Sequence, residues 1–397
     1  MIPFEKALKL TLEHARVEQR TERVSLSDAC GRIVAEDVAA DRDCPPFPKA
    51  AMDGYACRRQ DLRDGALLRI TGEVSAGAGF QGHISAENCA RILTGAPVPE
   101  GADCVIMQEQ TERLGDRVRI LRAQTADNIC AQGEDFRKGE IVVRRGERLG
   151  PPQIAVLAAC GAASPLVVRR PSVAVLSTGN ELVEPDCSPS AVQIRNSNAF
   201  QLMAQLQQMR VPGAYLGIAQ DSVAALAPAV EAAVESYDVT IITGGVSTGD
   251  YDLVPQVLRS MGFDTVFDSV AMQPGRPSHL AVHNSKVAWG LPGNPVSTFV
   301  VFELLVKPFL YRLMGHEFRP IVVAARLTEP VSRRSTSRQA AIPVRCSTAG
   351  EAVPVRFNGS ADIRAMANAD GVILIPAGMK GYEKGDIVNV RLLRAED

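Results

Sequence analysis

The sequence lacks three patterns that would place it in a class at once. It has nine cysteines but no C-x-x-C pair, and they do not cluster with the five histidines. Scattered cysteines in odd number predict reduced thiols, not disulfides or zinc. The 43 basic and 45 acidic residues are mixed along the chain, so no strong field favours nucleic acid.

Long apolar runs are also missing. No uninterrupted stretch reaches membrane-spanning length, and the charged N-terminus does not read as a signal peptide. We therefore expect a cytoplasmic protein whose partners are small molecules or proteins, with no nucleic acid and no membrane.

The chain is long, and its residue patterns change along its length. A chain of 397 residues predicts about two to four domains. We expect four parts, from the shifts between helical, glycine-rich β-type and alternating patterns. They are an N-terminal mixed domain at 1–40 and 137–168, which the family resemblance given below implies is the dimerisation domain, a β lobe inserted at 41–136, an α/β domain at 169–318 and a C-terminal β domain at 319–397.

The fold class follows from the second half of the chain. Strand and helix patterns alternate at 172–176, 198–209, 214–218, 222–236, 238–242, 253–261, 264–270 and 296–313. Such alternation predicts a doubly wound, mostly parallel sheet. Short β-type runs near 321–327, 341–346, 353–357, 372–375 and 387–392 predict a small C-terminal barrel, so the class is multidomain α/β plus β.

The loop at 243–252 is the most informative segment. It joins a buried strand to a helix, which is where α/β proteins bind phosphorylated ligands. Gly244 and Gly245 let backbone N–H groups approach an anion, and Asp250 and Asp252 could hold a divalent cation beside it. A tight structural turn is the other reading of the loop alone.

Further loops follow other strands of the same domain. Those at 177–181 and 291–297 should meet the first at the carboxyl edge of the sheet, which favours a ligand site. A helix beginning at Val296 would present free N–H groups and the Ser297 hydroxyl to an oxyanion. Arg276, in 273–277, offers a fork of donors for phosphate, with a solvated surface arginine as the alternative.

Taken together and in order, several segments resemble one family. They look like the molybdopterin molybdenumtransferases of the MoeA or gephyrin E-domain type, and they lie at 52–56, 94–103, 107–109, 133–135, 177–182, 243–252 and 291–297. The resemblance implies an α/β domain of the molybdopterin-binding type. It also implies a homodimer whose site lies between protomers, with the α/β domain of one facing the β lobe of the other.

The resemblance implies a reaction as well. Molybdate would be inserted into adenylylated molybdopterin, with Mg²⁺-dependent release of AMP, in molybdenum cofactor biosynthesis. An upstream molybdopterin adenylyltransferase and molybdoenzyme acceptors are the partners this implies.

By matching motif, the resemblance also assigns residue roles. The catalytic residues would be Asp53, Asp135, Asp221 and Asp252, and the metal ligands Asp250 and Asp252. The substrate would be bound by Thr94, Thr178, Glu181, Gly244, Gly245, Ser247, Arg276, Pro292, Asn294, Pro295 and Ser297.

Some positions depart from the family pattern. The family usually has Asn-Ser before its Ala-Met-Asp-Gly-Tyr, where this chain has Lys49 and Ala50, and it has arginines where this chain has Cys130, Ala131 and Gln132. These changes suggest a diverged paralogue serving a subset of molybdoenzymes. Two other functions remain open: molybdopterin adenylyl transfer, against which the β lobe argues, and a non-catalytic pterin-binding or scaffold paralogue.

Overall fold

The computed structural model describes residues 1–16, 20–246 and 253–393. Contacts divide the chain into two compact units, Met1–Glu22 with Val168–Asp397 and Arg23–Val167, and each is treated by itself. In the described part of the chain, no helix combines the length and apolar character needed to cross a membrane.

The first helix belongs to the larger unit. Helix α1 (Phe4–His14) buries Phe4, Ala7 and Thr11. The residues before α1 are hydrogen-bonded to the loop after strand β18 (Asp264–Phe267). Ile2 N–H donates to Ser269 O at 3.0 Å, and Ala271 N–H donates to Ile2 O at 2.7 Å. We expected 1–40 to lie with 137–168, so this differs from the sequence expectation. The other predicted boundaries stay predictions.

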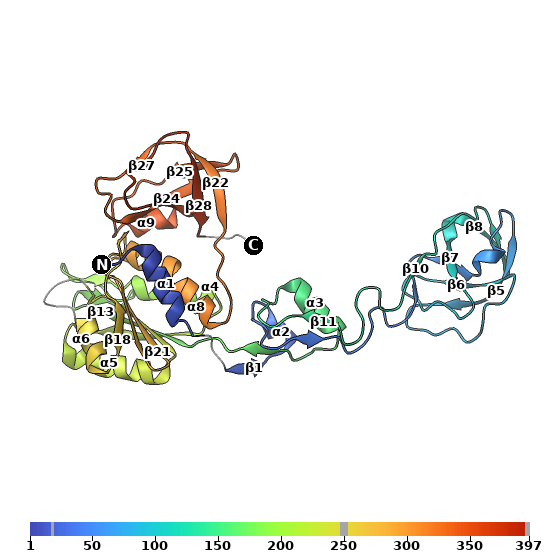
Figure 1. The fold of residues 1–397 in the computed structure, drawn as a ribbon, viewed down its shortest axis with the longest axis horizontal. Helices are drawn as coiled ribbons and strands as arrows, with labels where there is room; N and C mark the ends of the chain where they lie inside the picture. The colour runs from blue at the N-terminus through green and yellow to red at the C-terminus, as the bar shows by residue number, and fades with distance from the viewer. Residues whose placement is uncertain (17–19, 247–252, 394–397) are drawn as a thin grey trace. The chain divides into compact units, whose positions relative to one another are not determined.

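The larger unit contains the predicted doubly wound sheet (Figure 1). Its strand order is β16-β13-β17-β21-β20-β18. The first four strands are parallel, and β20 runs antiparallel to both of its neighbours. The strands are β13 (Val173–Thr178), β16 (Gly213–Ala219), β17 (Val239–Thr243), β18 (Asp264–Phe267), β20 (His279–His283) and β21 (Lys286–Leu291).

Helices cover both faces of this sheet, so its parallel strands are continuous apolar runs. On one face, Leu226 and Val254 of two helices pack with Leu176 and Ile242. On the other, Trp289 meets Phe309 edge to face with ring centroids 5.8 Å apart. The helices are α4 (Asn198–Gln208), α5 (Val223–Ser236), α6 (Leu253–Ser260), α7 (Pro295–Val301), a π-helical turn (Phe302–Val306) and α8 (Lys307–Leu313).

The predicted alternation is largely confirmed. All the expected elements of this domain are present, although β18 ends at Phe267 rather than at 270. The expected helix at 296–313 is α7 and α8 joined through the π-helical turn. The hairpin of β20 and β21 was not predicted. Its signal is the two-residue turn at Asn284 and Ser285, where Asn284 takes a φ of 53°.

The C-terminal residues form the expected barrel. Five strands close in the order β24-β25-β22-β28-β26 and back to β24, and a short strand β19 (Met272–Gln273) of the α/β domain adds parallel to β24. The barrel strands are β22 (Val322–Leu327), β24 (Gln339–Cys346), β25 (Glu351–Pro354), β26 (Gly371–Ile375) and β28 (Ile387–Leu392), with β23 (Val331–Ser332), β27 (Gly381–Tyr382) and helix α9 (Ile363–Ala367) beside them.

The smaller unit holds the β lobe. Its six-stranded sheet has the order β7-β4-β6-β5-β9-β8, with one apolar cluster around Ala56 and Ile92 and another around Cys57 and Ile106. The strands are β4 (Gly54–Cys57), β5 (Leu67–Val74), β6 (Asn88–Ile92), β7 (Cys104–Met107), β8 (Thr111–Leu114) and β9 (Arg117–Ile120). The rest of the unit contains α2 (Leu26–Ala29), β2 (Val38–Ala39), β3 (Lys49–Ala50), β10 (Ile129–Cys130), β11 (Ile141–Val143) and α3 (Pro151–Ala159).

Asp238, just before β17, is a strong anchor within the larger unit. Burial alone would raise the pKa of its carboxyl, but hydrogen bonds from the Ser172 backbone and hydroxyl and from Arg20 and Arg169 outweigh burial. They lower the pKa to about 2, from 3.8. The stabilisation of the folded state by the ionised Asp238 carboxylate is therefore complete above about pH 4, near the unfolded-state pKa. It is lost as the pH falls through the folded-state pKa.

We predict that Asp238→Asn is less stable than the parent at pH 7 by about 2 kcal/mol, the free energy that corresponds to this pKa shift. The difference should shrink as the pH falls from about 4 to about 2, because the parent carboxylate then takes up a proton. Urea unfolding across this pH range measures it, with the exposed Asp264→Asn as the control. A difference that does not change with pH would contradict this account.

Candidate functional site

The predicted loops gather at one edge of the α/β sheet. The parallel strands β13, β17 and β21 end at Thr178, Thr243 and Leu291, so the loops after them leave the same edge. The segment 268–278 also lies at this edge, because it joins the end of β18 to the start of antiparallel β20. The topology therefore supports the expected meeting of loops.

Gly244 brings the first two loops into direct contact. Its N–H donates to Leu291 O at 3.1 Å, and a Cβ added to it would stand 2.1 Å from the Thr178 carbonyl oxygen. Its φ of 94° lies in the left-handed region, as does the 61° of Gly245. Only glycine meets both demands at position 244. Gly293 completes the contact, since a Cβ on it would be 3.8 Å from Gly244 Cα.

Thr178 and Asp221 form a polar pair at this edge. The Thr178 hydroxyl, itself buried, donates to Asp221 Oδ1 at 2.6 Å, and Asp221 N–H donates to Asn180 Oδ1 at 3.1 Å. Asp221 is exposed and is held from both sides. The Glu181 side chain lies against Gly179, because a Cβ added to Gly179 would be 2.8 Å from Glu181 Oε2. Thr178, Glu181 and Asp221 are thus brought together with the glycine loop.

The third loop is fixed by a buried side chain. Asn198 Nδ2 donates to Thr243 Oγ1 at 2.9 Å and to Gly293 O at 2.8 Å. The Thr243 hydroxyl in turn donates to Pro292 O at 3.0 Å, and the Thr298 hydroxyl donates to the same oxygen. The sequence pattern places Asn198 only at the start of the predicted helix at 198–209. Its burial, at 7% exposed, is a tertiary property that the local pattern does not carry.

The start of α7 is not as free as expected. Val296 N–H donates to Ser360 O of the C-terminal domain at 3.0 Å, so the expectation of free N–H groups is wrong for this residue. Ser297 is only 4% exposed. Asn294 is exposed and Pro295 half-buried, so any anion here would meet the loop before the helix more readily than the helix end.

Arg276 lies in a loop that the barrel holds. Met272 and Gln273 pair with Gln339 and Ala340 of β24, and Gln339 N–H donates to Ala271 O at 2.9 Å. The Arg276 carbonyl accepts from Val270 N–H and Ser278 N–H, each at 2.9 Å, while its side chain is exposed. The backbone is thus fixed and the guanidinium projects from it at the carboxyl edge.

The β lobe carries its own carboxylate site. Asp53 Oδ1 accepts from the Thr94 backbone N–H and from the Thr94 hydroxyl, both at 2.7 Å. The bond from the Thr94 backbone lowers the pKa of Asp53 most, and the bond from the Thr94 hydroxyl and the nearby Arg91 lower it further. Burial acts in the opposite direction but is outweighed. The predicted Asp53 and Thr94 therefore do form a pair. Asp135 is exposed, and its Oδ2 lies 3.8 Å from Cys44 Sγ.

The departures from the family pattern lie together in the lobe. Strand β3 (Lys49–Ala50) pairs antiparallel with β10 (Ile129–Cys130), so Lys49 is opposite Cys130. On its other side, Ala50 N–H donates to Ala96 O at 2.9 Å, next to Thr94. Gln132 donates to Asp43 Oδ2 at 2.8 Å. Lys49, Ala50 and Cys130 therefore lie on one local ladder, and Gln132 lies beyond it.

Three predicted residues, Ser247, Asp250 and Asp252, lie outside the described residues. Within 1–16, 20–246 and 253–393, no group of three or more His, Cys, Asp or Glu side chains is placed to hold a metal ion. The described oxygen atoms beside the glycine loop include the carboxylates of Asp221 and Glu181 and backbone carbonyls. Oxygen ligands of this kind are those that Mg²⁺ prefers.

Comparison with known proteins places this geometry in a family. Three family profiles match: the MoeA N-terminal region (domain I and II) at 2–161, a probable molybdopterin binding domain at 174–312 and the MoeA C-terminal region (domain IV) at 323–393. The molybdopterin molybdenumtransferase of Bacillus subtilis (strain 168) is 34% identical over 409 residues, covering 100% of this chain and 95% of its own. The chain belongs to the MoeA family.

Other relatives agree. A molybdopterin molybdenumtransferase of Staphylococcus epidermidis is 33% identical over 98% of this chain and 95% of its own. The crystal structure of a MoeA protein from Pyrococcus horikoshii superposes with a TM-score of 0.85 at 33% identity, covering 100% of both chains. The expected fold class, including the α/β domain of the molybdopterin-binding type, is thereby confirmed for this MoeA chain.

The glycine contact yields a direct test. Gly244→Ala should lower the unfolding free energy by roughly 2 kcal/mol or more, because the new methyl group meets the Thr178 carbonyl in a left-handed backbone. Gly293→Ala is the matched control, since it meets only ordinary van der Waals contact. Thermal unfolding of both variants measures this, and equal losses would contradict the close-approach argument.

Proposed function

We propose that this protein inserts molybdate into adenylylated molybdopterin with Mg²⁺-dependent release of AMP, in the cytoplasm, during molybdenum cofactor biosynthesis. The observation that carries the proposal is the Thr178–Asp221 pair, held at 2.6 Å beside the Gly244 contact. It provides an oriented carboxylate at an edge where backbone groups can approach phosphate. The full-length similarity to molybdopterin molybdenumtransferases supports the same reaction.

The residues at the sheet edge fit this chemistry. Cleavage of a phosphoanhydride needs developing oxygen charge to be neutralised and an attacking oxygen to be placed in line. Gly244 and Gly245 would let the backbone approach the phosphates, and Arg276 and Ser297 are the candidates for binding molybdate or phosphate oxygens. Asp221, oriented by Thr178, would position the attacking oxygen.

Mg²⁺ would be held by Asp250 and Asp252. When bound, it supplies positive charge to the phosphate oxygens. The chain's own contribution is to orient the substrate between the glycine loop, the loop at 291–297 and Asp221.

The β lobe contributes an ionised carboxylate in this proposal. Asp53 is kept charged by Thr94, so it can accept a hydrogen bond from substrate. We propose that Asp53, Thr94 and Asp135 act in the site of the partner subunit of a homodimer. The same proposal includes substrate supply by a molybdopterin adenylyltransferase and delivery of product to molybdoenzymes.

The test is AMP release by the purified protein given adenylylated molybdopterin, Mg²⁺ and molybdate. We expect AMP release that requires molybdate and that falls at least about a hundredfold in Asp221→Ala. Tight binding of the pterin without AMP release would replace the proposal with a carrier or scaffold. Adenylyl transfer from ATP to molybdopterin would replace it with the preceding reaction.

The Asp53–Thr94 pair gives a separate prediction. In Thr94→Val the carboxylate loses the hydroxyl but keeps the backbone N–H, so the pKa of Asp53 should move up toward its ordinary value. The acid limb of the pH–activity profile should then move to higher pH, and Thr94→Ser should restore it. Thr71→Val, in strand β5 of the same lobe, is the control. An unchanged acid limb would exclude Asp53 as the titrating group.

A further inference from the structure

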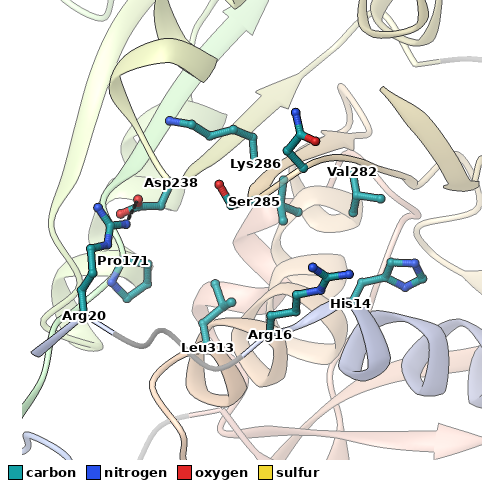
Figure 2. A pocket seen from close by; sticks show the side chains of 11 residues that line it. His14, Arg16, Arg20, Pro171, Asp238, Val282, Ser285, Lys286 and Leu313 are labelled. Atoms are coloured by element: carbon teal, nitrogen blue, oxygen red, sulfur yellow. Dashed lines mark hydrogen bonds and ion pairs between the residues drawn. The ribbon is translucent and has the colours of Figure 1, made fainter. Parts of the chain in front are cut away.

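A cavity of about 410 Å³ lies at the edge of the α/β sheet opposite the glycine loops. Asp238 directly precedes β17 and Lys286 begins β21, so the cavity is at the amino ends of these strands. Of the residues assigned above to substrate or catalysis, none that the structure describes lines it. Figure 2 shows Arg16 in the middle of the lining residues, with Arg20 and Asp238 to one side and His14 to the other.

The cavity is positively charged, although the chain as a whole has a net charge of −2. Arg16, Arg20 and Lys286 line it, and among the described residues that line it Asp238 is the only carboxylate. That carboxylate is already neutralised: Arg20 Nη2 lies 2.5 Å from Oδ1 and Arg169 Nη2 lies 2.8 Å from Oδ2. An anion entering the cavity therefore meets uncompensated positive charge.

Hydrogen-bond donors remain for such an anion. Arg16 is exposed, and its guanidinium makes no hydrogen bond or ion pair with the described residues. Lys286 Nζ donates to Glu235 O at 3.0 Å and to Tyr237 O at 2.9 Å, which leaves one N–H of the ammonium group for a ligand. The Ser285 hydroxyl is exposed beside it.

Apolar groups complete the lining. Leu313 and Val282 are half-buried, and Val287 and Pro171 are buried. A volume of about 410 Å³ is within the range of small-molecule sites, which combine mostly apolar walls with a few placed polar groups. A free inorganic ion would leave these apolar walls without a partner.

We propose that this cavity binds a small organic phosphate. The phosphate group is held by Arg16 and Ser285, and the apolar body rests on Leu313 and Val282. The site is separate from the proposed reaction and does not depend on it. Arg20 and Pro171 lie three residues from the two points where the chain passes between the units, so an occupant contacts the chain beside both connections.

The experiment is calorimetric titration of the full chain with phenyl phosphate. We expect saturable binding that weakens about tenfold or more in Arg16→Ala, because a charge-assisted, bidentate contact is lost. Ser285→Ala should weaken it less, since one neutral donor is removed. Arg364→Ala, an exposed arginine on α9 outside the cavity, should leave binding unchanged. Inorganic phosphate should bind more weakly than phenyl phosphate, because it gains nothing from the apolar walls.

Three results would overturn the proposal. The first is no saturable binding of phenyl phosphate, and the second is binding that Arg16→Ala and Ser285→Ala both leave intact. The third is binding lost in Ser297→Ala but kept in Arg16→Ala, which would place the ligand at the glycine edge. Because AMP release is assayed separately, failure here leaves the proposed reaction standing, and the reverse also holds.

Discussion

The carboxyl edge of the α/β sheet depends on the contact between the backbone of Gly244 and the carbonyl of Thr178. A Cβ atom at position 244 would lie 2.1 Å from that oxygen. The loops that follow the parallel strands β13 and β17 can therefore touch only if residue 244 is glycine. The Gly244 N–H bond to Leu291 O ties the third strand to the same point. The placing of Thr178, and through it of Asp221, follows from this packing. The geometry of the proposed site at this edge is thus set by the absence of a side chain at position 244.

The barrel takes part in the same edge. It pairs through β24 with β19, which precedes Arg276, and its Ser360 carbonyl accepts the first N–H of α7. The loop at 273–277 and the loop at 291–297, which the proposal assigns to substrate binding, are therefore both hydrogen-bonded to the C-terminal domain or directly adjoin a strand that is. Removal of the barrel would free a backbone donor at Val296 and unpair the strand before Arg276. The C-terminal domain is in this sense a support for the site rather than an appendage.

The sequence predicted what repeats locally and missed what depends on distant contacts. Alternating apolar periods located nearly all elements of the α/β domain, because buried parallel strands and amphipathic helices have distinct periods. The strand before the loop at 291–297 was expected without bounds, but its hairpin with β20 was missed, since the turn at Asn284 and Ser285 was not recognised. The role of Asn198 was missed because nothing local indicates that it donates to Thr243 and Gly293. The N–H of Val296 read as free because its acceptor is more than 60 residues away in the chain.

The departures from the family pattern are best understood through packing. Ala50 is 1% exposed and packs with Ala56, Ala90 and Ala96, so a small apolar residue suits this position in the lobe core. Its neighbour Lys49 is paired with Cys130, whereas Gln132 lies beyond this ladder and donates to Asp43. In the same lobe, the Thr94 backbone N–H and hydroxyl donate to Asp53 and lower the pKa of its carboxyl. The ionised state that the proposal requires of Asp53 therefore depends on Thr94 and not on Lys49 or Cys130.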